Sequence, residues 1–140
     1  MRPVAALFVR SDSVYKSMPD VDAYDAGRDA LTAVGVRFVA HPPCRSWSKL
    51  RAFVSRNFGE SELALFAIDQ VRRFGGVLEH PAGSLLWRRS DMPPLGTSIM
   101  DRHGGFFLAI PQRWFGHRAE KGDGFLHRRF VAGRCTWCAV

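Results

Sequence analysis

Two short segments carry the side chains best suited to chemistry. Residues 41–48 read HPPCRSWS and put a cysteine in a turn that two prolines impose directly after a predicted strand. Residues 77–84 read VLEHPAGS and end a second predicted strand in a glutamate, followed by a proline and a glycine turn. A thiolate is a strong nucleophile, and a glutamate that desolvation keeps protonated can donate to a ring nitrogen. The two segments predict nucleophilic attack by Cys44, assisted by Glu79.

Both residues also have a plain structural interpretation. Free cysteine is among the most buried residue types, so Cys44 can belong to the core. Glu79 can cap a loop or pair with one of the many arginines. Positive charge from Arg45, Lys49 or Arg51 would increase the thiolate fraction of Cys44 and would favour the chemical interpretation.

Together the two segments resemble the catalytic motifs of DNA cytosine carbon-5 methyltransferases. The family pairs a proline-proline-cysteine turn, here Pro42-Pro43-Cys44, with a glutamate-asparagine-valine turn, in which His80-Pro81 here replaces the last two residues. Glu79 lies 35 positions after Cys44, and the segment between them holds one predicted helix and the start of a strand, which is similar to the family's arrangement.

A third segment adds to the resemblance. Phe115-Gly116-His117-Arg118 is similar to the family's aromatic-glycine turn with a downstream arginine, and residues 130–133 resemble its closing strand. The family's proline-glutamine-x-arginine motif has a partial counterpart in Pro111-Gln112-Arg113. The arginine role is therefore open between Arg118, which we prefer, and Arg113.

The resemblance implies a role for each site residue. Cys44 would attack carbon 6 of a cytosine, Glu79 would engage ring nitrogen 3 and the exocyclic amine, and Arg118 would stabilise the base. Trp47, Trp87 or Trp114 would stack on a flipped base or fill its place, although burial in the core is the commoner fate of tryptophan. The residues expected to contact the substrate are Pro43, Arg45, Ser46, Trp47, His80, Pro81, Arg113 and His117.

The resemblance also implies S-adenosylmethionine as cofactor. The family holds it with a phenylalanine-x-glycine-x-glycine loop, whereas residues 8–12 read FVRSD and contain no glycine. Asp25, after the second predicted strand, stands where such folds keep an acid for the ribose hydroxyls, and Asp12 is a second candidate.

The predicted elements alternate between strand and helix. Strands are expected at residues 4–9, 21–25, 36–40, 77–78, 106–110 and 125–132. Helices are expected at residues 26–34 and 61–74, the second with Ser61 as N-cap and Gly75-Gly76 as its end. A long loop at residues 88–105 would lie near the site. This order predicts an α/β fold: a single small Rossmann-like, methyltransferase-like domain over residues 1–140, with an open, mostly parallel sheet flanked by helices and no separate target-recognition domain.

The composition favours a basic, globular, intracellular protein. The net charge is +7 and 46 % of the residues are hydrophobic, which favours a polyanionic partner such as DNA. No apolar run is long enough to span a membrane. Three cysteines indicate free thiols in a cytoplasm, and Cys135 and Cys138 form a pair that alone is a weak metal signal. We therefore expect no metal.

Three functions fit these observations. The first is methyl transfer to cytosine in DNA through a Cys44 adduct. The second is a catalytically inactive methyltransferase-like module that binds DNA or a protein. Such a module would act as a partner subunit or in phage counter-defence, because compact proteins similar to this one occur in bacteriophage genomes. The third is related chemistry on RNA or a free nucleotide.

Overall fold

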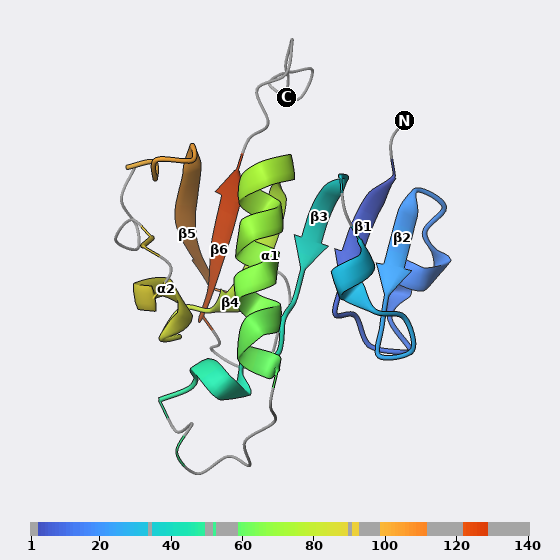
Figure 1. The fold of residues 1–140 in the computed structure, drawn as a ribbon, viewed down its shortest axis with the longest axis horizontal. Helices are drawn as coiled ribbons and strands as arrows, with labels where there is room; N and C mark the ends of the chain where they lie inside the picture. The colour runs from blue at the N-terminus through green and yellow to red at the C-terminus, as the bar shows by residue number, and fades with distance from the viewer. Residues whose placement is uncertain are drawn as a thin grey trace.

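The computed structural model describes residues 3–33, 35–49, 52, 59–89, 91–92, 99–111 and, for the backbone, 122–128. These residues build one six-stranded sheet with the order β2-β1-β3-β4-β6-β5 (Figure 1). The strands are β1 (Val4–Leu7), β2 (Val21–Tyr24), β3 (Arg37–Ala40), β4 (Gly76–Pro81), β5 (Gly105–Pro111) and β6 (Gly122–Arg128). The helices are α1 (Glu60–Phe74) and the short α2 (Leu86–Arg89).

Four of the strands are parallel. β1 pairs with β2 and β3, and β3 pairs with β4, all in parallel register. β6 runs antiparallel to both β4 and β5. The fold is therefore α/β with a mostly parallel sheet, as predicted from the alternation of elements.

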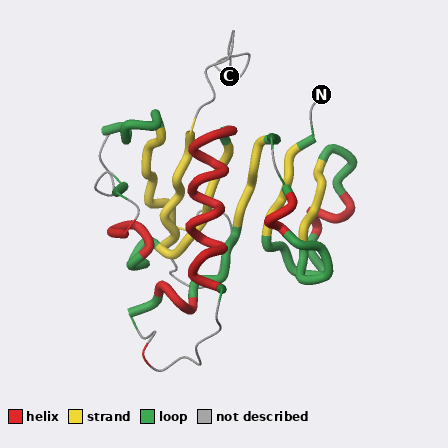
Figure 2. Tube along the Cα trace, in the orientation of Figure 1, coloured by secondary structure: helices red, strands yellow, loops and turns green. Residues whose placement is uncertain are grey.

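The long helix α1 lies across the sheet (Figures 1 and 2). Its buried side chains recur at three- and four-residue spacing and are Ala64, Ala67, Ile68, Gln70 and Val71. They pack against the sheet residues Phe38 and Leu78, both of which are fully buried. The predicted helix is confirmed, with Gly75 at its C-cap at φ 81°. The predicted N-cap is wrong, because Ser61 lies within the helix and Gly59 occupies the cap position.

The predicted helix at residues 26–34 does not form in the described residues. Only a 3-10 turn, Ala30–Thr32, is present. Asp25 accepts a hydrogen bond from the Gly27 N–H, and Asp29 accepts one from the Leu31 N–H. These local bonds give the backbone partners other than a helical ladder.

Strand β4 is longer than expected and continues to Pro81. The extension arises because Glu79, His80 and Pro81 pair with β6, a partner that local sequence does not reveal. Glu79 consequently lies within a strand, so its backbone is fixed by pairing.

The other sequence predictions have mixed outcomes. Within the long loop predicted at residues 88–105, the structure places the end of α2 and the start of β5, and residues 93–98 lie outside the described residues. The last strand, predicted at 125–132, is found as Gly122–Arg128. No helix in the described part of the chain is long and apolar enough to cross a membrane.

An ion pair with a buried carboxylate lies at the amino edge of the sheet, the end at which the parallel strands begin. Arg72, in the last turn of α1, donates to the Asp101 carboxylate at 3.0 Å. Asp101 also accepts hydrogen bonds from the backbone N–H groups of His103 and Gly105. These bonds tie the turn before β5 to the end of the helix.

Candidate functional site

The carboxyl ends of β1, β3 and β4 lie side by side at one edge of the sheet. Chain order reverses direction between β1 and β3, because β2 lies on one side of β1 and β3 on the other. In open α/β sheets such a switch point leaves a crevice where ligands bind. Both segments singled out in the sequence, residues 41–48 and 77–84, meet this edge.

Cys44 stands in the turn after β3, and its thiol is exposed. The turn is fixed on the side of the strand by the buried Pro42 and continues into a 3-10 helix, Arg45–Trp47. An exposed thiol at this position does not fit the alternative of a core cysteine. It is accessible to a ligand at the sheet edge.

Arg45, which was expected to act on the thiol or on phosphates, forms an ion pair with Glu60 at the start of α1. Its side chain remains more than half exposed, at 57 %. Part of its charge is thus offset by the helix carboxylate, and the pair links the cysteine turn to α1.

Glu79 contacts His41, the residue directly after β3. The distance from Nδ1 of His41 to Oε2 of Glu79 is 2.8 Å. The register explains the contact, because Ala40 pairs with Leu78 and the next residue of each parallel strand follows in step. Glu79 therefore has a histidine as one partner, and the predicted pairing with an arginine stays a prediction.

The two segments are also joined through the backbone. The carbonyl of Trp47 accepts hydrogen bonds from the Leu85 N–H at 3.0 Å and from the Ser84 hydroxyl at 3.4 Å. The turn that carries Cys44 is therefore fastened to the segment that follows Glu79. Pro43 and Ser46 are half-buried beside it, as are Trp47 and Pro81.

His80 and Trp87 lie in the core. His80 is 1 % exposed and meets Trp87 edge to face, with ring centroids 5.8 Å apart. Trp87 also packs on Phe107 and donates from Nε1 to the Pro81 carbonyl at 2.8 Å. These positions hold the strand that carries Glu79. The substrate roles expected of His80 and Trp87 stay predictions, although neither side chain reaches the surface here.

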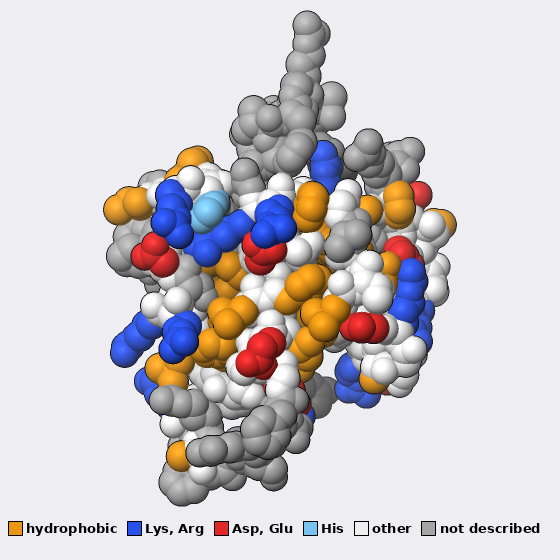
Figure 3. Space-filling model, viewed as in Figure 1, with side chains coloured by type: hydrophobic (Ala, Val, Ile, Leu, Met, Phe, Trp, Pro, Cys, Tyr) orange, Lys and Arg blue, Asp and Glu red, His pale blue; other side chains and the backbone are white. Residues whose placement is uncertain are grey.

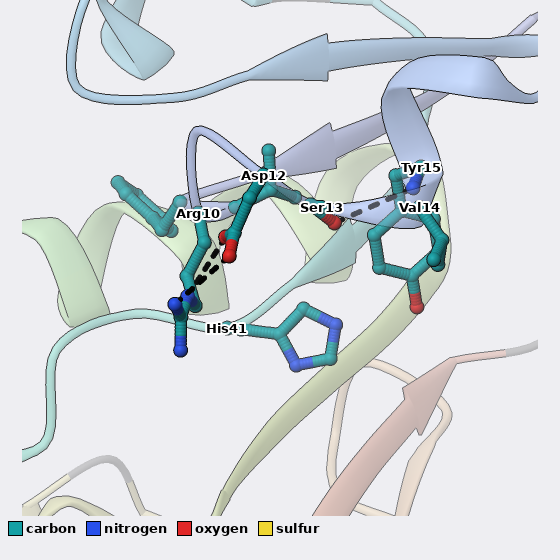
Figure 4. Close-up of a pocket in the computed structure, with 8 residues that line it drawn as sticks. Arg10, Asp12, Ser13, Val14, Tyr15 and His41 are labelled. Carbon is teal, nitrogen blue, oxygen red and sulfur yellow. Dashed lines mark hydrogen bonds and ion pairs between the residues drawn. The ribbon is translucent and has the colours of Figure 1, made fainter.

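An open pocket of about 400 Å³ lies at the switch point, within the range of ligand sites. It is lined by Phe8, Val9, Arg10, Asp12, Ser13, Val14, Tyr15 and His41 (Figure 4). The His41 ring stacks on Tyr15 with centroids 5.9 Å apart and an interplanar angle of 30°. Arg10 pairs with Asp12 at 2.9 Å at the same pocket.

The pocket begins at a backbone turn without glycine. Phe8 has φ 61°, a left-handed conformation that costs a non-glycine residue free energy and is concentrated at functional sites. Phe8 thereby supplies the turn that a glycine supplies in other strand-to-loop connections.

The two acids expected to hold a cofactor have partners. The Arg10 hydrogen bond to Asp12 lowers the pKa of that exposed carboxyl. Asp25, directly after β2, pairs with Lys16 and accepts from the Gly27 N–H, and the Lys16 hydrogen bond is the main cause of its lowered pKa. Both groups are ionised at neutral pH. Of the two, only Asp12 belongs to the pocket lining.

Sequence reasoning missed His41 and Tyr15. His41 precedes the two prolines and was treated only as part of the strand break, although its place one residue beyond β3 is the signal for a side chain at the sheet edge. Tyr15 had no such signal, because only the folded loop brings it to His41. Arg113, Trp114, His117, Arg118, Cys135 and Cys138 lie outside the described residues.

Lys and Arg side chains gather over α2 and the turn before β5 on the face that carries α1 (Figure 3). The exposed residues of these elements include Arg88, Arg89 and Arg102. Arg88 and Arg89 follow the carboxyl end of β4, whereas Arg102 lies at the amino edge; exposed arginines of this kind suit contact with phosphates.

Comparison with protein-family models, with curated proteins and with solved structures finds no match to this chain.

Proposed function

We propose that this protein is a compact DNA cytosine methyltransferase that acts on carbon 5 through a covalent adduct with Cys44. The observation that carries the proposal is that the cysteine turn after β3 and Glu79, in the neighbouring parallel strand β4, meet at the same edge of the sheet. An exposed cysteine follows β3, and Glu79 is joined to the residue after β3 at 2.8 Å. A nucleophile and a proton-donating carboxyl have to meet in this way to act on one ring.

The topology supports a Rossmann-like assignment. The order β2-β1-β3-β4 is that of a doubly wound sheet with a switch point between β1 and β3. The pocket lies beside that point, and the cysteine turn borders it through His41. A cofactor and a base would therefore bind on adjacent parts of one edge.

The chemistry follows from the two groups. The Cys44 thiolate adds to carbon 6 of cytosine, and the displaced ring electrons reach nitrogen 3, where a proton from Glu79 neutralises the charge. Carbon 5 thereby becomes nucleophilic. After carbon 5 has gained its substituent, loss of its proton expels Cys44 and restores the ring. The arginine predicted at position 118 would bind the base, which must leave the DNA stack first.

S-adenosylmethionine, when bound, supplies an electrophilic methyl group. The pocket suits it in place and size, and Asp12 and Tyr15 offer a negative charge and an aromatic face to a sulfonium cation. Asp25 would bind the ribose hydroxyls by exchanging its Lys16 partner, since exposed ion pairs are weak.

A specific observation favours a second function, a binding module without catalysis. Phe8 takes the left-handed turn where the family keeps glycines, and it is one of the residues that line the pocket. The turn therefore lacks the glycines with which the family holds its cofactor. In this case the net charge of +7 would serve DNA binding, or the sheet edge would bind a protein partner.

The deciding experiment is mass spectrometry of nucleosides from the DNA of cells that express the protein. We expect 5-methylcytosine in wild type and none with Cys44→Ala, which alters an exposed side chain and should fold normally. A thermal-shift measurement with S-adenosylmethionine should show a rise in Tm in both proteins. Unmodified DNA together with no thermal shift would overturn the proposal in favour of the binding module.

A further inference from the structure

His41 connects the two halves of the candidate site. Its Nδ1 is 2.8 Å from Oε2 of Glu79, and its ring lines the pocket and stacks on Tyr15. Figure 4 shows the ring beside Tyr15 in the pocket. A single side chain therefore contacts both the carboxylate at β4 and the pocket at β1.

The backbone holds His41 firmly. Its N–H donates to the Leu7 carbonyl at 3.2 Å, which extends the pairing of β3 with β1 by one residue. Pro42 follows and is buried, so the chain is rigid on both sides of His41. A side chain anchored in this way can fix the orientation of a partner group.

The contact with Glu79 also bears on which nitrogen of the His41 ring carries the hydrogen. While Glu79 is ionised its carboxylate only accepts, so Nδ1 carries the hydrogen in this resting pair. The proposed reaction requires Glu79 to be protonated once a base is bound. The other ring nitrogen, Nε2, is buried and has no hydrogen-bond partner among the described residues.

We propose that His41 is a positioning residue, which holds the Glu79 carboxylate in the orientation needed to engage the substrate ring. The proposal rests on the proposed function, because it assigns Glu79 to a bound base. It adds a residue that the resemblance to the methyltransferase motifs does not supply. Loss of the Nδ1 donor should therefore impair turnover more than DNA binding.

The kinetic test compares two substitutions of His41. His41→Leu removes the donor, whereas His41→Asn keeps an amide N–H close to the place of Nδ1. For methyl transfer to DNA we expect His41→Leu to lower kcat at least about tenfold with KM for DNA changed less than about threefold. His41→Asn should recover most of kcat. The matched control is His103→Asn, in the turn before β5, which should behave as wild type.

Two kinetic results would overturn the inference. The first is an unchanged kcat in His41→Leu. The second is an equal loss in the leucine and asparagine variants, which would indicate that the imidazole serves only packing.

A second readout needs no activity. Nitrogen-detected NMR of the histidine side chains should show the Nδ1–H form of His41 in wild type and its loss in Glu79→Ala, while the His103 signals stay in place. The inference would be overturned, whatever the activity, by a His41 ring in the Nε2–H form. It would also be overturned if the His41 signals did not change in Glu79→Ala. If wild type is inactive and the NMR result is as expected, the proposed reaction fails while the link between His41 and Glu79 stands.

Discussion

Ion pairs between a basic side chain and a carboxylate lie at both edges of the sheet, and the Arg72–Asp101 and His41–Glu79 pairs differ in burial. At the amino edge, the side chains of Arg72 and Asp101 are 15 % and 3 % exposed. At the carboxyl edge, those of His41 and Glu79 are 32 % and 22 % exposed. The first pair is enclosed with backbone donors on the same carboxylate, whereas the second borders an open pocket.

The difference separates a structural pair from a pair at the candidate site. A buried ion pair fixes geometry strongly, because removal of one partner leaves a desolvated charge. A partly exposed pair contributes little to stability, and its carboxylate stays within reach of a ligand. The amino edge therefore holds the sheet together, and the carboxyl edge carries the candidate chemistry.

The largest expected effect is at Gly76, where β4 begins at the amino edge. A Cβ on this residue would overlap the backbone of Phe38 on β3, and its φ of 137° disfavours other residues. Gly76→Ala should lower the free energy of unfolding by about 3 kcal/mol, measured by urea denaturation. Gly83→Ala, in the carboxyl-edge turn with open space around it, is the control and should change stability by less than about 0.5 kcal/mol. Equal losses of unfolding free energy in the two variants would contradict the conclusion that position 76 requires a glycine.

Next in size is the exchange of each carboxylate for its amide. Asp101→Asn would leave the half-buried Arg72 facing an amide donor, and should cost roughly 2 to 3 kcal/mol of unfolding free energy. Glu79→Gln should cost less than about 1 kcal/mol and should abolish methyl transfer. Urea denaturation measures the unfolding free energy of both variants. If Glu79→Gln proves the more destabilising, the functional reading of the carboxyl edge is wrong.

The smallest effect is on acid stability. Burial alone would raise the pKa of Asp101 above its ordinary 3.8, but hydrogen bonds from Gly105 and His103 N–H and the Arg72 guanidinium outweigh it and lower the pKa. A carboxyl with a lowered folded-state pKa stabilises the fold above the unfolded pKa and loses this contribution as pH falls through the folded value. Wild type should thus lose stability below about pH 4, and Asp101→Asn should lose less over the same range. Identical slopes of unfolding free energy against pH would exclude this role.

Local pattern was sufficient for some elements. The apolar spacing within residues 61–74 predicted α1, and short runs of branched and aromatic residues predicted the six strands. It failed at residues 26–34, where Asp25 and Asp29 bind nearby backbone N–H groups in place of a helix. Alanine content suggested a helix there, and specific side-chain bonds prevented it.

The sequence by itself determined the α/β class, the position of the long helix and the turn that carries Cys44. These depend on local propensities and on proline, which act within a few residues. Only the tertiary structure decided that β4 extends through Glu79, that His41 meets this carboxylate and that Tyr15 stacks on His41. Such contacts depend on strand register and on loops closed between distant residues, and register is set by the packing of the whole sheet.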